Sequence, residues 1–159
     1  MKILLVSDTH GKDENLELAV EAARPFDLLA HCGDVEGREY YIEALAETPC
    51  LFVAGNNDFW SDLESENVLT LENHRIFMTH GHYYGVSRGP ERLADEARRR
   101  YCDTVFYGHI HRPVWEVVGG VTMLNPGSLT YPRQTGRRPS YMVLECVPTD
   151  PVRPEIFYL

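Results

Sequence analysis

The sequence predicts an α/β fold in which two β-sheets pack together and are flanked by helices. Three observations lead to this prediction. The length of 159 residues fits one compact domain spanning residues 1–159. Short aliphatic runs alternate with amphipathic helical stretches through the first two thirds of the chain, whereas only strand patterns follow Val114. A chain that begins as α/β and ends as all-β favours two stacked sheets.

The first two thirds repeat the order strand, polar turn, helix. Residues 3–6 form a continuous aliphatic run, as expected of a strand that is covered on both faces. Residues 15–23 have helical periodicity, and Pro25 ends this helix. The same patterns predict, in chain order, a strand at 27–30, a helix at 38–46, strands at 51–54 and 75–78, a helix at 90–101 and a strand at 104–107.

The last third predicts strands alone. Two aliphatic runs, at residues 114–118 and 121–124, flank Gly119 and Gly120, and a two-glycine connection is typical of a β-hairpin. Residues 141–147 and 155–158 supply two more strands.

Composition and charge argue against several classes of protein. The chain has 15 Lys and Arg against 24 Asp and Glu, a net charge of −9. This balance argues against nucleic acid or an anionic membrane as a partner, because phosphate contacts supply most of that affinity. No apolar run approaches the roughly 18 residues of a membrane-spanning helix, and the first run is shorter than a signal-peptide core. The four cysteines form no CxxC pair, so free thiols and a cytoplasmic location are expected.

A polar cluster follows each of five predicted strands. In chain order the clusters are Asp8-Thr9-His10, Gly33-Asp34, Gly55-Asn56-Asn57-Asp58, His80-Gly81-His82 and Gly108-His109-Ile110-His111. Of the seven histidines, all but His74 lie within or beside these clusters. Because the carboxyl ends of parallel strands share one edge of a sheet, we expect the clusters to meet there.

The residue types in these clusters predict a site for divalent transition-metal ions. Carboxylates, a carboxamide and imidazoles form an oxygen and nitrogen donor set, which suits Mn, Fe, Ni or Zn better than Ca. The ligands are more numerous than one ion needs, whereas two ions that share a bridging carboxylate use all of them. A pair of divalent ions is the arrangement for in-line attack on phosphorus.

In this order the five clusters resemble the signature of the calcineurin-like metallophosphoesterases, D-x-H, G-D, G-N-x-[D/E], H-G-H and G-H-x-H. The later Asn125-Pro126-Gly127-Ser128 and the terminal strands are similar to the small YfcE-like phosphodiesterases of bacteria and archaea. The resemblance implies a four-layer αββα sandwich with the metals at the carboxyl edge of its sheets. It also implies hydrolysis of small phosphodiesters by in-line attack of a metal-bridging hydroxide.

The resemblance further implies a role for each residue of the clusters. The first metal would be held by Asp8, His10 and His111, the second by Asn56, His80 and His109, with Asp34 as the bridging and catalytic carboxylate. Manganese is the expected metal at both positions, with Ni, Fe and Zn as alternatives.

One position departs from the wider family. Many relatives have a histidine after the ligand asparagine, where it protonates the leaving group, and this chain has Asn57. A carboxamide is no general acid at neutral pH, so slow turnover of poor leaving groups is expected unless His82 or a metal-bound water supplies the proton. We expect Asn57 and His82 to belong to the catalytic site, His82 as a contact to the substrate.

Several alternatives stay open at this point. The retromer subunit of eukaryotes has this fold and works as a protein-binding scaffold, and a phosphomonoesterase or nucleotide phosphatase would use the same ligands. A nuclease is disfavoured by the acidic charge, and homo-oligomerisation is left open. For Asp58 we expect a structural role. The pairs Phe59-Trp60 and Tyr83-Tyr84 either stack on a substrate ring or pack the rim of the site.

Overall fold

The computed structural model describes residues 1–159 and contains two mixed five-stranded sheets. The first sheet has the order β10-β9-β1-β2-β3, with β1 (Lys2–Val6), β2 (Leu28–His31), β3 (Cys50–Phe52), β9 (Ser140–Glu145) and β10 (Arg153–Tyr158). The second has the order β4-β5-β6-β8-β7, with β4 (Glu66–Leu71), β5 (His74–Thr79), β6 (Thr104–Phe106), β7 (Pro113–Val118) and β8 (Val121–Pro126).

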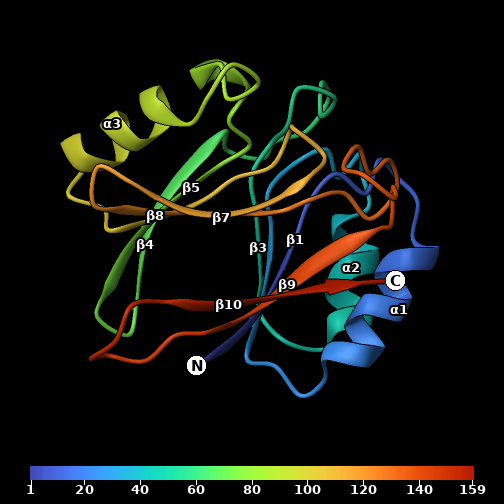
Figure 1. The fold of residues 1–159 in the computed structure, drawn as a ribbon. Coiled ribbons are helices and arrows are strands. Elements are labelled where there is room, and N and C mark those ends of the chain that lie inside the picture. The colour runs from blue at the N-terminus through green and yellow to red at the C-terminus, as the bar shows by residue number, and fades with distance from the viewer.

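Helices cover the outer faces of both sheets (Figure 1). Helices α1 (Glu14–Ala23) and α2 (Glu39–Ala46) lie together on one side, and α3 (Glu91–Arg99) lies on the other. A short 3₁₀ turn, η1 (His82–Tyr84), follows β5. The layers are therefore helices, sheet, sheet and helix, which confirms the predicted αββα sandwich.

The hydrophobic core follows from the alternation of side chains along each strand. In β1, Ile3 and Leu5 face the core between the two sheets, whereas Leu4 and Val6 pack against the residues of α1 and α2. The second sheet does the same, because Phe77 packs with α3 while its neighbours face inward. This burial on both faces explains why the strands are continuous aliphatic runs in the sequence.

The strands that precede the polar clusters run parallel to their neighbours. In the first sheet β1 pairs in parallel with β2, and β2 with β3; in the second sheet β5, β6 and β8 are parallel. Helices α1 and α2 provide the crossovers between the strands of the first sheet. The carboxyl ends of these strands therefore open on a shared edge of the sandwich.

Strand β4 is the one strand that the sequence patterns did not predict. It pairs antiparallel with β5 at the edge of the second sheet, and its side chains are half-buried or exposed. Val68 and Leu69 stand next to each other, so the strand lacks the alternation of apolar and polar residues that indicates a half-buried strand. The predicted hairpin is confirmed, since β7 and β8 pair antiparallel around Gly119 and Gly120, both with positive φ.

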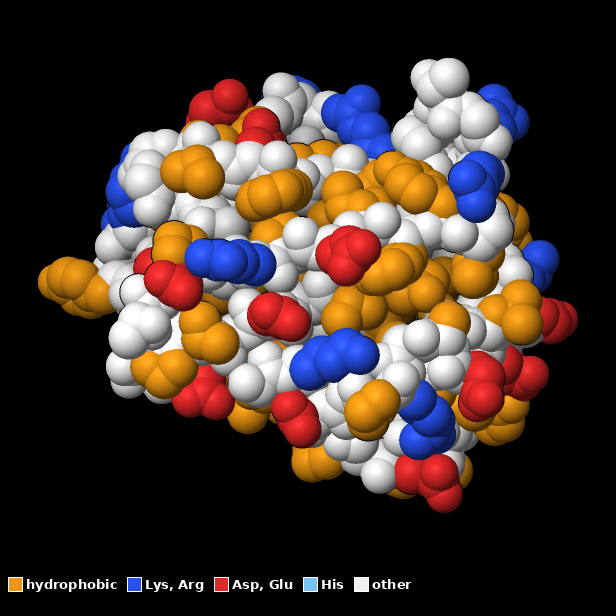
Figure 2. Space-filling model, turned by 60° about the horizontal axis from the view of Figure 1, so that its bottom comes forward, with side chains coloured by type: hydrophobic (Ala, Val, Ile, Leu, Met, Phe, Trp, Pro, Cys, Tyr) orange, Lys and Arg blue, Asp and Glu red, His pale blue; other side chains and the backbone are white.

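The surface carries charges of both signs. Figure 2 shows a face on which acidic and basic side chains are interspersed and hydrophobic side chains gather between them. No continuous basic stripe crosses this face. None of the helices has the length and apolar character that crossing a membrane requires.

Candidate metal centre

The polar clusters meet at the shared carboxyl edge because backbone hydrogen bonds tie their loops together. The amide of Asp8 donates to Gly33 O over 3.0 Å, and the amide of His10 donates to Asp34 O over 2.9 Å. In the same way, Gly108 N donates to His80 O over 3.2 Å. The amide of His109 donates to Asp8 Oδ2 over 3.0 Å, so the loops after β1, β2, β5 and β6 form one connected surface.

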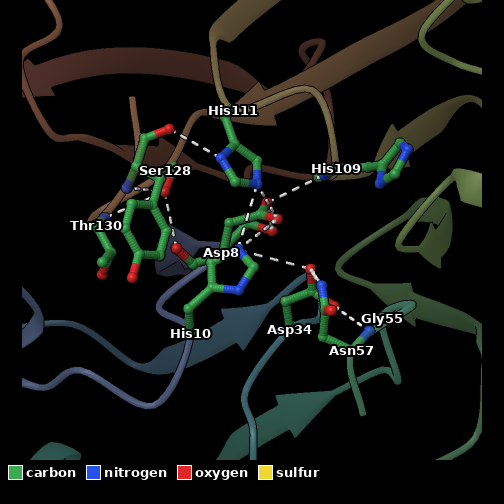
Figure 3. Close-up of polar contacts among 12 residues, drawn as sticks. Asp8, His10, Asp34, Gly55, Asn57, His109, His111, Ser128 and Thr130 are labelled. Atoms are coloured by element: carbon green, nitrogen blue, oxygen red, sulfur yellow. Dashed lines mark hydrogen bonds and ion pairs between the residues drawn. The ribbon is translucent and has the colours of Figure 1, made fainter. Parts of the chain in front are cut away.

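Four of the predicted ligands form a compact group. The ligand atoms of Asp8, His10, Asp34 and His111 all lie within 4.8 Å of one another. His111 Nε2 is 3.0 Å from Asp8 Oδ1, and His10 Nε2 is 3.7 Å from the same oxygen and 3.6 Å from Asp34 Oδ2. Figure 3 shows the rings of His10 and His111 next to each other at the Asp8 carboxylate, with Asp34 beside them.

The other three predicted ligands form a second group that shares Asp34. His80 Nε2 lies 3.5 Å from Asp34 Oδ2 and 3.0 Å from Asn56 Oδ1. His109 Nδ1 is also 3.0 Å from Asn56 Oδ1. All seven side chains therefore converge. Both groups approach Asp34 Oδ2, and His80 Nε2 also lies 3.8 Å from Asp8 Oδ1, so the two groups adjoin at both carboxylates.

Hydrogen bonds fix which nitrogen of three rings faces the centre. His80 Nδ1 donates to Cys32 O over 2.6 Å and His111 Nδ1 donates to Tyr131 O over 2.8 Å, because a carbonyl oxygen only accepts. His10 Nδ1 lies 2.8 Å from Glu36 Oε1. Each ring is thus held with Nε2 toward the carboxylates, as is typical of metal-ligating histidines.

The arrangement of the donor atoms, and not only the residue types, fits a site for divalent cations. Asp8 Oδ1 is fully buried and accepts no hydrogen bond, although a ring nitrogen lies 3.0 Å away. His10 Nε2 and His111 Nε2 are 3.3 Å apart, a distance at which they share at most one proton. Lone pairs that converge on a buried carboxylate repel one another unless a cation lies between them.

The charges of the group act strongly on one another. Burial alone raises the pKa of Asp8, but the nearby rings of His10, His111 and His80 outweigh it and hold that pKa well below its usual value. Burial lowers the pKa of His10, yet Asp8 and Glu36 outweigh burial and raise it to about 9. Burial and the neighbouring His80 lower the pKa of His109. A metal that binds here therefore displaces protons, so affinity falls as the solution becomes acidic.

The backbone of the site is strained. Five of the seven predicted ligands have positive φ, namely Asp8 (55°), His10 (50°), Asp34 (56°), His109 (72°) and His111 (55°). Non-glycine residues rarely adopt this region, and each costs of order 1 kcal/mol. Such a concentration of strain is typical of a functional site.

Comparison with known proteins places this geometry in a family. A family model described as the calcineurin-like phosphoesterase superfamily domain matches residues 1–148. The chain belongs to this superfamily. The probable metallophosphoesterase YsnB of Bacillus subtilis is 36% identical over 147 residues, covering 91% of this chain and 83% of the relative. The phosphodiesterase YfcE of Escherichia coli is 40% identical over 75 residues, covering 47% of this chain and 36% of the relative.

Solved structures agree with this assignment. A Vps29 mutant from Entamoeba histolytica superposes with a TM-score of 0.79 at 26% identity, covering all of this chain and 99% of that one. The resemblance to calcineurin-like phosphoesterases that the sequence motifs indicate is therefore confirmed, for the family and for the fold. Metallophosphoesterases of this family imply divalent metal ions, and the group around Asp8 is a candidate to hold them.

Asn57 and Asp58 organise the loop after β3 of this phosphoesterase. Asn57 donates from its backbone N to Asp34 Oδ1 and from Nδ2 to Asp34 Oδ2, each over 2.8 Å. Asp58 is buried and accepts backbone hydrogen bonds from Val35, Glu36 and Gly55, so its predicted structural role is confirmed. Asn57 thus holds the carboxylate that both ligand groups approach.

His82 lies at the outer side of the second ligand group. Its ring centroid is 5.4 Å from that of His80 and 6.1 Å from that of His109. Burial and the neighbouring His80 lower its pKa, and its Nδ1 is buried without a hydrogen-bond partner. The ring thus lies beside the second ligand group, and its contact with a substrate stays a prediction.

The sequence patterns missed the residues that support the ligands from outside. Ser128 Oγ donates to Asp8 O over 2.8 Å, and Thr130 Oγ1 donates to Thr9 O over 2.7 Å (Figure 3). Glu36 binds His10, and the carbonyl of Tyr131 binds His111. Ser128 and Thr130 follow β8 directly, and polar residues directly after a strand were the signal for this supporting role.

His31 gives the native state a pH dependence. It is fully buried, lies 2.9 Å from Thr9 Oγ1 and accepts a hydrogen bond from Gly33 N. Burial lowers its pKa to about 4, from 6.5. Between these values the unfolded chain binds a proton that the native protein does not, so the free energy of unfolding falls as the pH drops.

We expect wild-type protein to lose roughly 2 kcal/mol more stability than His31→Gln between pH 7 and pH 5. Urea unfolding of both chelated proteins at the two pH values measures this difference, and all other titrating groups cancel in the comparison. A pH dependence that is the same in both proteins would show that His31 is not the group responsible.

Proposed function

We propose that this phosphoesterase is a dinuclear, metal-dependent phosphodiesterase that hydrolyses small phosphodiesters by in-line displacement at phosphorus. One observation carries the proposal. Asp34 Oδ2 lies 3.6 Å from His10 Nε2 and 3.5 Å from His80 Nε2, between two sets of oxygen and nitrogen donors. A carboxylate in that position is able to serve two ions at once.

In the proposed enzyme the first ion is held by Asp8, His10 and His111, and the second by Asn56, His80 and His109. When bound, two such ions supply Lewis acidity toward the phosphate oxygens and lower the pKa of an attacking water. The donor set suits manganese, with Ni, Fe and Zn as alternatives.

The chain's own residues position these groups. The carbonyls of Cys32 and Tyr131 hold His80 and His111 in the required tautomer, and the amide of Asn57 orients Asp34. His82 would contact the substrate beside the second ion. Because burial excludes water from Asp8 and Asp34, charges in the centre interact more strongly than at the surface.

A matrix of metals and substrates tests the proposal. Chelated protein is reloaded with Mn, Ni, Fe, Zn or Mg and assayed on p-nitrophenyl monoesters and diesters, with metal content measured in parallel. We expect two ions per chain and the highest kcat/KM for a small diester. A preference for monoesters would support a phosphomonoesterase or nucleotide phosphatase, and no hydrolysis with any metal would overturn the proposal.

Asn57→His tests whether position 57 faces the leaving group. An imidazole there is able to protonate a departing alkoxide, which a carboxamide cannot. We expect hydrolysis of alkyl esters to rise about tenfold, with a much smaller gain for p-nitrophenyl esters, whose leaving group needs no proton. Equal gains on both substrates, or none, would show that position 57 acts on Asp34 alone.

A protein-binding scaffold is the second candidate function. The similarity to Vps29 and the gathering of hydrophobic side chains in Figure 2 favour it. Metal binding alone does not separate the two candidates, since a Vps29 structure from Entamoeba histolytica is complexed with Zn²⁺. The metal and substrate matrix separates them, since a scaffold would leave every ester intact.

A further inference from the structure

A groove of about 730 Å³ opens directly beside the candidate metal centre. One wall is the first half of α2, with Glu39, Tyr40 and Glu43, and the other is the loop 57–63 that follows β3. Glu36 and Asn57 line the groove and also contact the ligands His10 and Asp34. A group bound in this groove therefore lies next to the site of phosphate chemistry. The volume is that of a small-molecule site.

The groove is acidic. Five of its 13 lining residues are carboxylates and none is a lysine, arginine or histidine. The Asp58 carboxylate accepts hydrogen bonds from backbone amides, and the Glu36 carboxylate is hydrogen-bonded to His10. The other three are Glu39, Glu43 and Asp62, whose side chains form no hydrogen bond or ion pair. Glu39 and Glu43 stand four residues apart on α2, a like-charge spacing that destabilises a helix unless a cation offsets it.

Three aromatic side chains stand at the same groove with unusually large exposure. Trp60 is 99% exposed, Tyr40 86% and Phe59 76%. They come from α2 and from the opposite loop, so aromatic faces are available on both walls. Exposing these apolar side chains to water is unfavourable, and they contribute little to the packing of the fold. Aromatic faces combined with unpaired carboxylates are the chemistry that recognises an alkylammonium ion.

We propose that this groove binds an ammonium group carried by the substrate, so that the enzyme prefers phosphodiesters of amino alcohols. The inference rests on the proposed phosphodiesterase function and names the class of its substrate. The carboxylates attract the cation, and the aromatic faces replace part of its hydration. The same charge repels esters with further phosphate groups, in agreement with the net charge of −9.

A binding experiment on chelated protein tests the groove without any catalysis. Choline is titrated into Trp115→Phe, in which Trp60 is the only remaining tryptophan, and tryptophan emission is followed. The neutral isostere 3,3-dimethylbutanol is the matched ligand. We expect choline to change the emission and to bind about tenfold more tightly than the isostere. Equal affinities, or a response that persists in Trp60→Phe, would overturn the proposal.

Two double variants with the same change of net charge test whether the groove carboxylates are responsible for choline binding. Glu39→Gln/Glu43→Gln is expected to weaken choline binding about fivefold. Glu21→Gln/Glu116→Gln, exposed positions outside the groove, is expected to leave it unchanged. Equal losses in both variants would assign the effect to net charge and overturn the site.

Hydrolysis by the manganese-loaded enzyme separates this proposal from the one on which it rests. The substrates are p-nitrophenyl phosphorylcholine and p-nitrophenyl 3,3-dimethylbutyl phosphate, and kcat/KM is expected to favour the first about tenfold. Hydrolysis of both at equal kcat/KM would overturn the ammonium groove and retain the phosphodiesterase. Choline binding without hydrolysis under any metal would support the groove and overturn the phosphodiesterase.

Discussion

Asp34→Asn is expected to reduce kcat roughly a thousandfold and to lower the occupancy of both metals together. The substitution keeps the shape of the side chain and removes its charge. Since Asp34 Oδ2 is approached by donors from both groups, the loss reaches both ions. Metal content per chain and calorimetric titration of the chelated protein measure the occupancy.

His109→Ala is the matched comparison. Its Nδ1 approaches only Asn56 among the proposed ligands of the second ion, so one ion is expected to be lost while the other is retained. Thermal unfolding of the chelated proteins checks the fold, because the amide in Asp34→Asn keeps only one acceptor for the two hydrogen bonds from Asn57 while it removes the repulsion with the nearby Asp8. Two ions at full occupancy in Asp34→Asn would disprove the bridging role.

The fold could be predicted where a strand or helix is determined by its own residues. Residues 3–6 are aliphatic at every position because both faces of β1 are covered, and that pattern is visible without knowing what covers them. Strand β4 could not be predicted from its own residues. Its half-buried side chains depend on the pairing with β5, and the pairing is not written in the six residues themselves.

The candidate site divides in a similar way. The seven predicted ligands follow strands directly, so the sequence places them at one edge as soon as the strands are known to be parallel. The supporting contacts join positions far apart in the chain, as with Ser128 and Asp8, which are separated by 120 residues. Such pairs are set by the packing of two sheets. The groove escaped prediction for the same reason, because α2 and the loop after β3 approach only in the folded chain.

Gly55→Ala is expected to destabilise the protein by about 3 kcal/mol and to weaken metal binding about a hundredfold. A Cβ at this position would overlap both the backbone N and Oδ1 of Asp34 and would lie 2.8 Å from its Cγ. The backbone of the neighbouring loop cannot move away, because Asn57 N and Nδ2 hold the same carboxylate. Chemical unfolding and calorimetric titration with manganese measure the two effects.

Gly136→Ala separates this clash from ordinary backbone strain. Gly136 has a φ of 85°, and a Cβ there would meet nothing within 4 Å, so its replacement is expected to cost about 1 kcal/mol and to leave metal binding intact. Gly55 needs no positive φ, and any loss at that position therefore comes from the displaced Asp34. Wild-type manganese affinity in Gly55→Ala would mean that the carboxylate tolerates displacement, and that the close approach of the two loops is not what positions it.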